Sequence, residues 1–163
     1  MRICIVLAFL STPAFAGTHR LALGREAWSV RTTGTTVVKP GSYRADVATK
    51  AWTIEVRSWP TSSVFVQTAD AQLARLVQAD PALVVLRREI RAKSDWVLVV
   101  ERGDGSVHGV VLRPGRHDNA ICTFDVARDW AQPLAACRSL EPVRRVRMSS
   151  VRVPEVEPRI DRT

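Results

Sequence analysis

The chain has 163 residues, a length that suits one domain of ordinary size with a hydrophobic core of its own. Its 24 basic residues outnumber its 16 acidic residues, which gives a net charge of +8. No apolar stretch approaches the about 20 residues that a helix needs to cross a bilayer, so we expect no membrane span.

The first 16 residues, MRICIVLAFLSTPAFA, are typical of a secretory signal peptide. Arg2 supplies a positive charge, residues 3–10 form a short apolar run, and residues 14–16 give the small-x-small pattern that signal peptidase accepts. The alternative is a buried first strand, which would not need the flanking arginine or the Ala-x-Ala pattern. We therefore expect cleavage after Ala16 and a periplasmic or secreted mature protein.

The basic charge has two interpretations. It could attract an acidic partner, such as an anionic polymer of the cell envelope. Alternatively, all but three of the basic residues are arginine in a chain rich in Ala and Val, as a GC-rich bacterial genome would produce. The basic residues are spread along the chain and mixed with acids, so we favour the second interpretation and expect no nucleic-acid partner.

The N-terminal third of the expected mature chain gives few signals. Residues 17–50 are weakly patterned, with a strand edge and turn, or an ordered loop, around residues 32–42. Residues 52–58 alternate between apolar and polar side chains, the pattern of a half-buried strand. A turn over residues 59–63 and a second strand over residues 64–67 predict a hairpin.

A helix and an ambiguous segment follow. Leu73, Leu76 and Val77 have helical spacing after Asp70, which predicts a helix over residues 70–79. Asp80-Pro81 could begin a second helix, but the short apolar run of residues 82–86 is equally typical of a buried strand that ends at Arg87. We favour the strand.

The strongest local signal lies in residues 96–112. The apolar run 96–100, a Gly-Asp-Gly turn and the returning run 107–112 predict a β-hairpin. Neither run alternates cleanly, so we expect this hairpin to be central in its sheet and covered on both faces.

A change of period marks the C-terminal part. Val126, Trp130, Leu134 and Cys137 fall on one stripe of a helix that Asp125 would cap. Pro133 should kink or split this helix. Residues 143–163 are rich in Arg, Val and Pro, and we expect an edge strand there, followed by a loose tail.

Cys122 and Cys137 are the cysteines outside the predicted signal peptide. An even number of thiols in an exported chain favours a structural disulfide, because a redox pair would more naturally be Cys-x-x-Cys. The helical stripe turns Cys137 toward the core. The disulfide should therefore tie the second helix to the sheet.

Residues that could carry chemistry do not form a known motif. His108, His117, Asp118 and Cys122 match no zinc spacing, so we expect no metal site and no cofactor. Asp104, Ser106 and His108 could share one face of a strand, but no nucleophile elbow accompanies them. Paired carboxylates stay open, and the unplaced glutamates are Glu26, Glu55, Glu89 and Glu101.

Two features could be interaction surfaces. Trp59, beside Pro60 in a predicted turn, could be an exposed interface anchor, or its ring could fold back over the hairpin. Arg144, Arg145 and Arg147 form the densest basic run, which could meet an acidic partner or simply be solvated.

Together these patterns predict one α+β domain over residues 17–142. Its antiparallel sheet of about five strands would carry two helices and one disulfide. Without a recognisable catalytic constellation, we expect a non-enzymatic binding protein of the bacterial envelope that acts through a protein–protein surface, for example an inhibitor, an immunity protein or an assembly factor. The alternatives are a binder of an anionic envelope polymer and a small periplasmic hydrolase with an unrecognised site.

Overall fold

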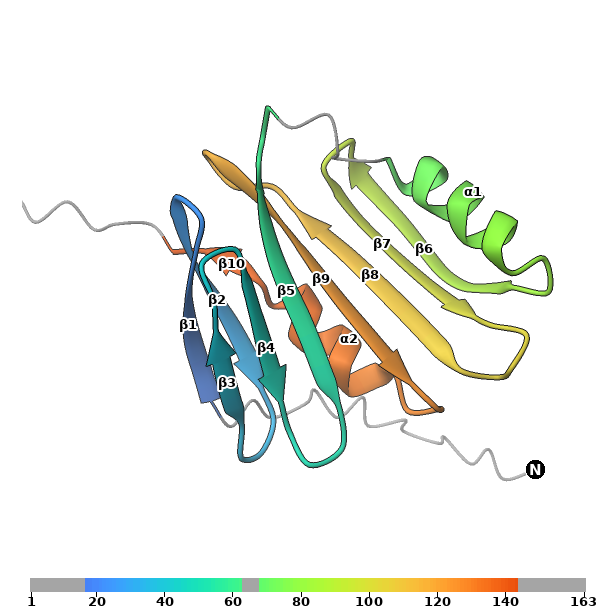
Figure 1. Ribbon diagram of the computed structural model, residues 1–163, viewed down its shortest axis with the longest axis horizontal. Helices are drawn as coiled ribbons and strands as arrows, with labels where there is room; N and C mark the ends of the chain where they lie inside the picture. Colours follow the sequence, from blue (N-terminus) through green and yellow to red (C-terminus); the bar gives the residue numbers. More distant parts are fainter. Residues whose placement is uncertain (1–16, 63–67, 144–163) are drawn as a thin grey trace, which may run out of the picture.

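The computed structural model describes residues 17–62 and 68–143, which form ten strands and two helices (Figure 1). The elements are β1 (Gly17–Leu23), β2 (Glu26–Thr32), β3 (Val37–Pro40), β4 (Arg44–Ala48), β5 (Thr53–Pro60), α1 (Ala69–Ala79), β6 (Val84–Ala92), β7 (Asp95–Glu101), β8 (Val107–Arg113), β9 (Asp118–Val126), α2 (Ala131–Arg138) and β10 (Glu141–Pro142).

The strands form two antiparallel sheets. The large sheet has seven strands in the order β3-β4-β5-β9-β8-β7-β6, and the small sheet has the order β1-β2-β10. The α+β class, with two helices, is confirmed. The expectation of about five strands is wrong, because β1 to β4 arise from the weakly patterned residues 17–50.

One face of the large sheet, here called the inner face, is covered by the small sheet and by α2, which lies behind the large sheet in Figure 1. Alternation along the strands supplies this core. The small sheet contributes Trp28 and Val30, both fully buried, while β5 contributes Ile54 and Val56. Phe124 of β9 fills the centre.

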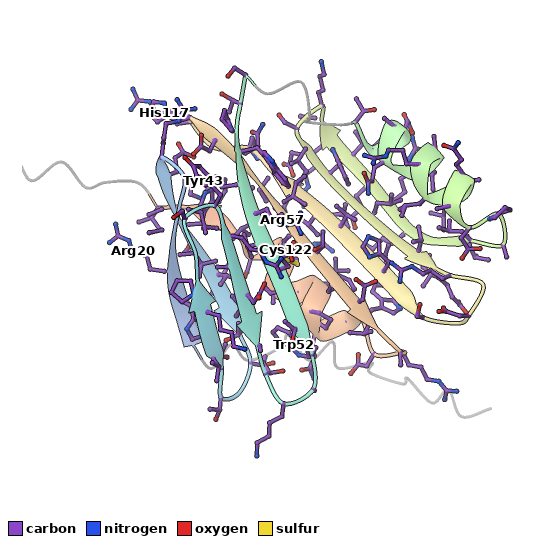
Figure 2. The ribbon with its side chains drawn as sticks, viewed as in Figure 1. Arg20, Tyr43, Trp52, Arg57, His117 and Cys122 are labelled. Carbon is purple, nitrogen blue, oxygen red and sulfur yellow. A yellow bond between two sulfur atoms is a disulfide. The ribbon has the colours of Figure 1, made fainter. Side chains whose placement is uncertain are left out.

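The predicted disulfide is present, between Cys122 on β9 and Cys137 on α2, with Cα atoms 5.4 Å apart. Figure 2 shows the sulfur pair near the middle of the molecule. Because β9 is the fourth of seven strands, the bond ties α2 to the centre of the sheet. Closing a loop of this length stabilises a folded chain by about 3 kcal/mol in the chain-entropy description.

The helix expected over residues 70–79 is confirmed as α1. Its cap is Thr68, whose hydroxyl accepts a hydrogen bond from the Ala71 backbone N, and Asp70 lies in the first turn. Leu73 and Leu76 pack on the second face of the large sheet, the outer face, against buried side chains of β7 and β8. The central hairpin is also confirmed, as β7 and β8.

Two predictions about strands are corrected. The hairpin of residues 52–58 with 64–67 is wrong, because β5 pairs with β4 on one edge and with β9 on the other; residues 64–67 lie outside the described residues. The strand expected to end before Arg87 runs on to Ala92 as β6, and it is an exposed edge strand, not a buried one.

The helix expected to begin at Asp125 is also corrected. Residues up to Val126 continue β9, and α2 begins only at Ala131, after Trp130. Pro133 lies in the first turn of α2, where a missing N–H breaks no helical hydrogen bond, so no kink arises. Cys137 points into the core, as expected.

The predicted signal peptide, the basic run Arg144, Arg145 and Arg147, and the expected edge strand and tail all lie outside the described residues. Neither of the two helices that the structure describes is long and apolar enough to span a membrane.

Candidate functional site

The outer face of the large sheet is covered unevenly. Helix α1 packs over β7 and β8 and leaves the neighbouring surface of β9 and β5 open. A groove with a volume of about 490 Å³ lies between α1 and the open surface of β9 and β5. This volume lies within the range of about 300–1,000 Å³ that is usual for ligand sites.

Strand β5 forms one side of the groove because its side chains alternate between the two faces. Glu55, Arg57 and Trp59 point to the groove, while the residues between them enter the core. Arg57 is labelled on β5 in Figure 2. Trp59, the predicted interface anchor, is half-buried: its ring is neither fully exposed nor part of the core. Its role at an interface stays a prediction.

The register of the strands places an apolar strip along the floor. Ile121 of β9 lies opposite Arg57 of β5, and Thr123 lies between Glu55 and Val110. On the side next to α1, the strip ends at the ring of Trp96, which is buried under this helix. The floor is therefore apolar in the middle and charged along the β5 side.

Helix α1 forms the opposite side with Gln72 and Arg75, which share one helical face at a spacing of three residues. Arg75 is exposed and has no ion pair within residues 17–62 and 68–143. Arg57, across the groove, is paired with Glu55. Two guanidinium groups thus stand on either side of an apolar floor.

Glu55 is held by more than one partner. Its carboxylate lies 2.8 Å from Nη2 of Arg44 and is also paired with Arg57. Arg44 reaches Asp46 as well, at 3.2 Å, and these ion pairs continue along β4. The Glu55 carboxylate is therefore paired with arginines of its own sheet. Among the charged residues that line the groove, Arg75 is the one without an ion-pair partner in the described part of the chain.

His108 stands at the end of the groove near the β7–β8 turn. Its Nδ1 is 3.0 Å from Oδ1 of Asp125, which also pairs with Nη2 of Arg102 at 2.8 Å. The hydrogen bond with His108 lowers the pKa of Asp125, and the charges of His108 and Arg102 lower it further, although burial acts in the opposite direction. The bond from Nδ1 to Asp125 thus holds the His108 ring in place at this end of the groove.

The structure separates the residues considered for catalysis. His108 is bonded to Asp125, whereas Asp104 accepts a hydrogen bond from the Ser106 backbone N at 2.8 Å, within the hairpin turn. The side chains of Asp104, Ser106 and His108 therefore form no relay.

The predicted carboxylates are also dispersed. Glu26 accepts hydrogen bonds from the backbone N atoms of Arg116 and His117, at 2.7 and 2.8 Å. Glu89 lies on β6, paired with Arg138 of α2. Glu55 is the one glutamate of the four that lines the groove.

The residues considered for metal binding are engaged elsewhere. Cys122 is in the disulfide, and the Asp118 carboxylate is bound by Arg25 through the backbone N at 2.6 Å and through Nη2 at 3.0 Å. Among the residues that the structure describes, no group of three or more His, Cys, Asp or Glu side chains comes together to hold a metal ion.

Sequence reasoning missed most of the groove. The alternation of Glu55 and Arg57 with apolar neighbours did indicate an outward polar face on β5. Nothing in the sequence connected that face with Arg75 on α1 or with His108 on β8, because the contact depends on the order of the strands.

Comparison of the chain with models of known protein families, and with curated proteins, gives no significant match.

Proposed function

We propose that this chain is a small exported binding protein of the bacterial envelope and that it holds a segment of a partner protein in the groove between β5 and α1. The observation that carries the proposal is the composition of the groove: Trp59 at one side, an apolar floor, and the uncommitted Arg75 at the other side. Aromatic and arginine side chains are the residues most enriched at the energetic centres of protein interfaces.

Export is inferred from the predicted signal peptide and is supported by the disulfide, because disulfides persist in oxidising compartments. Cleavage after Ala16 would leave all of the described residues in the mature protein. The mature protein would then act in the periplasm or outside the cell.

The polarity of the groove suggests what the partner segment contains. An apolar side chain would lie on Ile121 and Val110, and an acidic group beside it would reach Arg75. A binding role also agrees with the committed charges of Glu55 and Asp125, which are tied to residues of this chain. Neither carboxylate stands free to move a proton.

Site-specific cross-linking tests the proposal. A photoreactive residue at Gln72, on the wall of the groove, should cross-link to one envelope protein when the full chain is made in cells. The same residue at Tyr43 serves as the control, because this aromatic side chain is 63% exposed and lies outside the groove.

The purified partner should then bind the wild-type chain and should bind Trp59→Ala at least about 30-fold more weakly, which is the effect of truncating an interface hot spot. Tyr43→Ala should bind as the wild type does. Binding that Trp59→Ala and Arg75→Glu both leave unchanged would contradict the proposal, as would equal cross-linking from positions 72 and 43.

An anionic envelope polymer is the second candidate, and the two guanidinium groups of Arg57 and Arg75 favour it. Such a ligand would be held by charge and would need the apolar floor far less.

A further inference from the structure

The two edges of the large sheet differ sharply. At one end, β3 has four residues and carries Lys39 and Pro40, both of which discourage a further strand. At the other end, β6 has nine residues, and among the described residues no strand lies beyond it (Figure 1). A long edge presents a row of backbone donors and acceptors that another strand can pair with.

Strand β6 exposes several apolar side chains, together with Arg88 and Arg91. Seven large hydrophobic side chains are exposed in the described part of the chain, and four of them are on this strand. The most exposed of the four are Val84, at 56%, and Ile90, at 51%. Exposed apolar side chains gathered on one strand mark an interaction surface more often than scattered single ones do.

Three of the four charged residues of β6 are held at a face of their own sheet by ion pairs and do not block its edge. The fourth, Arg91, is exposed and has no ion pair among the described residues. Arg88 pairs with Asp70 of α1 on the outer face. Glu89 pairs with Arg87 and with Arg138 of α2 on the inner face. The pairing of β6 with β7 is interrupted within the strand at Leu86 and at Arg91, and the four residues from Arg87 to Ile90 between these positions pair regularly.

The sequence of β6, VVLRREIRA, is complementary to itself when two copies run antiparallel. With Arg88 on the two-fold axis, Arg87 lies opposite Glu89 of the second copy, and Leu86 lies opposite Ile90 of the second copy. Shifting the centre to residue 87 or 89 would instead place Arg87 opposite Arg87 or Glu89 opposite Glu89. The two Arg88 side chains that meet at the axis are each neutralised by Asp70 of their own copy.

We propose that β6 is a dimerisation edge: two copies of this chain pair their β6 strands antiparallel about Arg88, which joins their large sheets into one. The contact is isologous, as in most homodimers. It is separate from the binding role proposed above, because β6 contributes no residue to the groove.

Analytical ultracentrifugation of the mature, disulfide-bonded chain, residues 17–163, over a concentration series tests the assembly. The wild type should sediment as a dimer, and Ile90→Lys should raise the dimer dissociation constant at least about tenfold, since it loses an apolar pair twice across the axis. Val37→Lys is the matched control, because Val37 is equally apolar and 58% exposed on the opposite edge strand. Circular dichroism checks that both variants fold.

A cysteine scan tests the register. Arg88→Cys should form a disulfide-linked dimer, because residues directly opposite in an antiparallel pair have Cα atoms about 4.5–5.5 Å apart, within disulfide range. Arg87→Cys and Glu89→Cys should each cross-link poorly alone and efficiently when the two proteins are mixed.

A chain that stays monomeric over the whole series overturns the proposal, whether the edge is covered by another segment of the same chain or left for a different protein. A dimer that Ile90→Lys does not weaken, or that cross-links at 87 alone as well as at 88, overturns it too.

Discussion

The sulfur atoms of Cys122 and Cys137 join the central strand of the large sheet to α2, and both side chains are fully buried. Cys122 lies between Val56 of β5 and Val111 of β8 in the register of the sheet. The bond therefore anchors α2 at the middle of the inner face, where the small sheet also packs.

Removing both sulfur atoms by Cys122→Ala with Cys137→Ala should lower the free energy of unfolding by about 3 kcal/mol, because the unfolded chain regains the entropy of the loop between them. Urea unfolding monitored by tryptophan fluorescence measures the loss. The mature wild type, cleaved after Ala16 and so without Cys4, should show no reactive thiol when it is titrated in denaturant. Free thiols in freshly secreted protein, or a double variant as stable as the wild type, would contradict this account.

A second prediction concerns Gly109 of β8, which lies opposite Phe124 of β9. A side-chain carbon at Gly109 would stand 2.0 Å from Cζ of the Phe124 ring, which is only 2% exposed. Gly109→Ala should therefore lower the free energy of unfolding by about 1–3 kcal/mol, the usual effect of overpacking a core.

The control is a double-mutant cycle with Phe124→Leu, which makes room for the added methyl group. The effects of Gly109→Ala and Phe124→Leu should be non-additive, with the double variant more stable than their sum implies. Simple additivity would show that the ring does not lie against the glycine.

The elements that the sequence predicted correctly are those whose signal is local. The β7–β8 hairpin has two apolar runs around a short turn, where Gly105 adopts φ 79°, and α1 has leucines at helical spacing. Both can be interpreted without knowing what they pack against.

The prediction of the second helix was wrong at its start because a strand pattern and a helix pattern overlap in the same residues. Val126 and Trp130 fit a helical stripe with Cys137, but Cys122, Phe124 and Val126 also alternate as the inward side chains of β9. The strand prevails because these residues fill the core between the sheets. The strands before residue 50 were missed because their inward residues, such as Trp28 and Val30, pack against strands that come much later in the sequence.

The groove was still less accessible to sequence reasoning. Trp59 was singled out, but its neighbours come from α1, β8 and β9, which only the strand order brings together. The sequence shows that Glu55 and Arg57 point outward; it does not show what they face.

The hydrogen bond between His108 and Asp125 gives a prediction about pH. The pKa of Asp125 is lower in the folded chain, chiefly through the hydrogen bond with His108. A carboxyl of this kind stabilises the fold above its unfolded pKa of about 3.9, and this contribution is lost as the pH falls through the folded pKa. The free energy of unfolding of Asp125→Asn should therefore fall less than that of the wild type as the pH is lowered.

Because the Asp125 side chain is 57% exposed, its contribution should not exceed about 1 kcal/mol. Urea unfolding of both proteins between about pH 2 and about pH 7 measures it, with the difference largest near neutral pH. A difference between Asp125→Asn and the wild type that is equal at all pH values would reject the linkage.

The last prediction separates the two kinds of ligand proposed for the groove. A partner protein held by Trp59 and the apolar floor should lose little affinity when the salt concentration rises, because apolar burial is not screened. An anionic polymer held by Arg57 and Arg75 should lose affinity steeply, since exposed charges are screened within about 8 Å at physiological ionic strength.

Charge reversal at Arg144, Arg145 and Arg147 provides an independent arm of this test, as these residues form the densest basic run of the chain. Reversal should leave the affinity for a partner protein close to that of the wild type, and Trp59→Ala should weaken it. For a polymer the order is inverted: reversal should weaken binding more than Trp59→Ala does. Affinities measured for all three proteins at low and high salt decide between the two ligands, because each ligand predicts a different variant as the weakest.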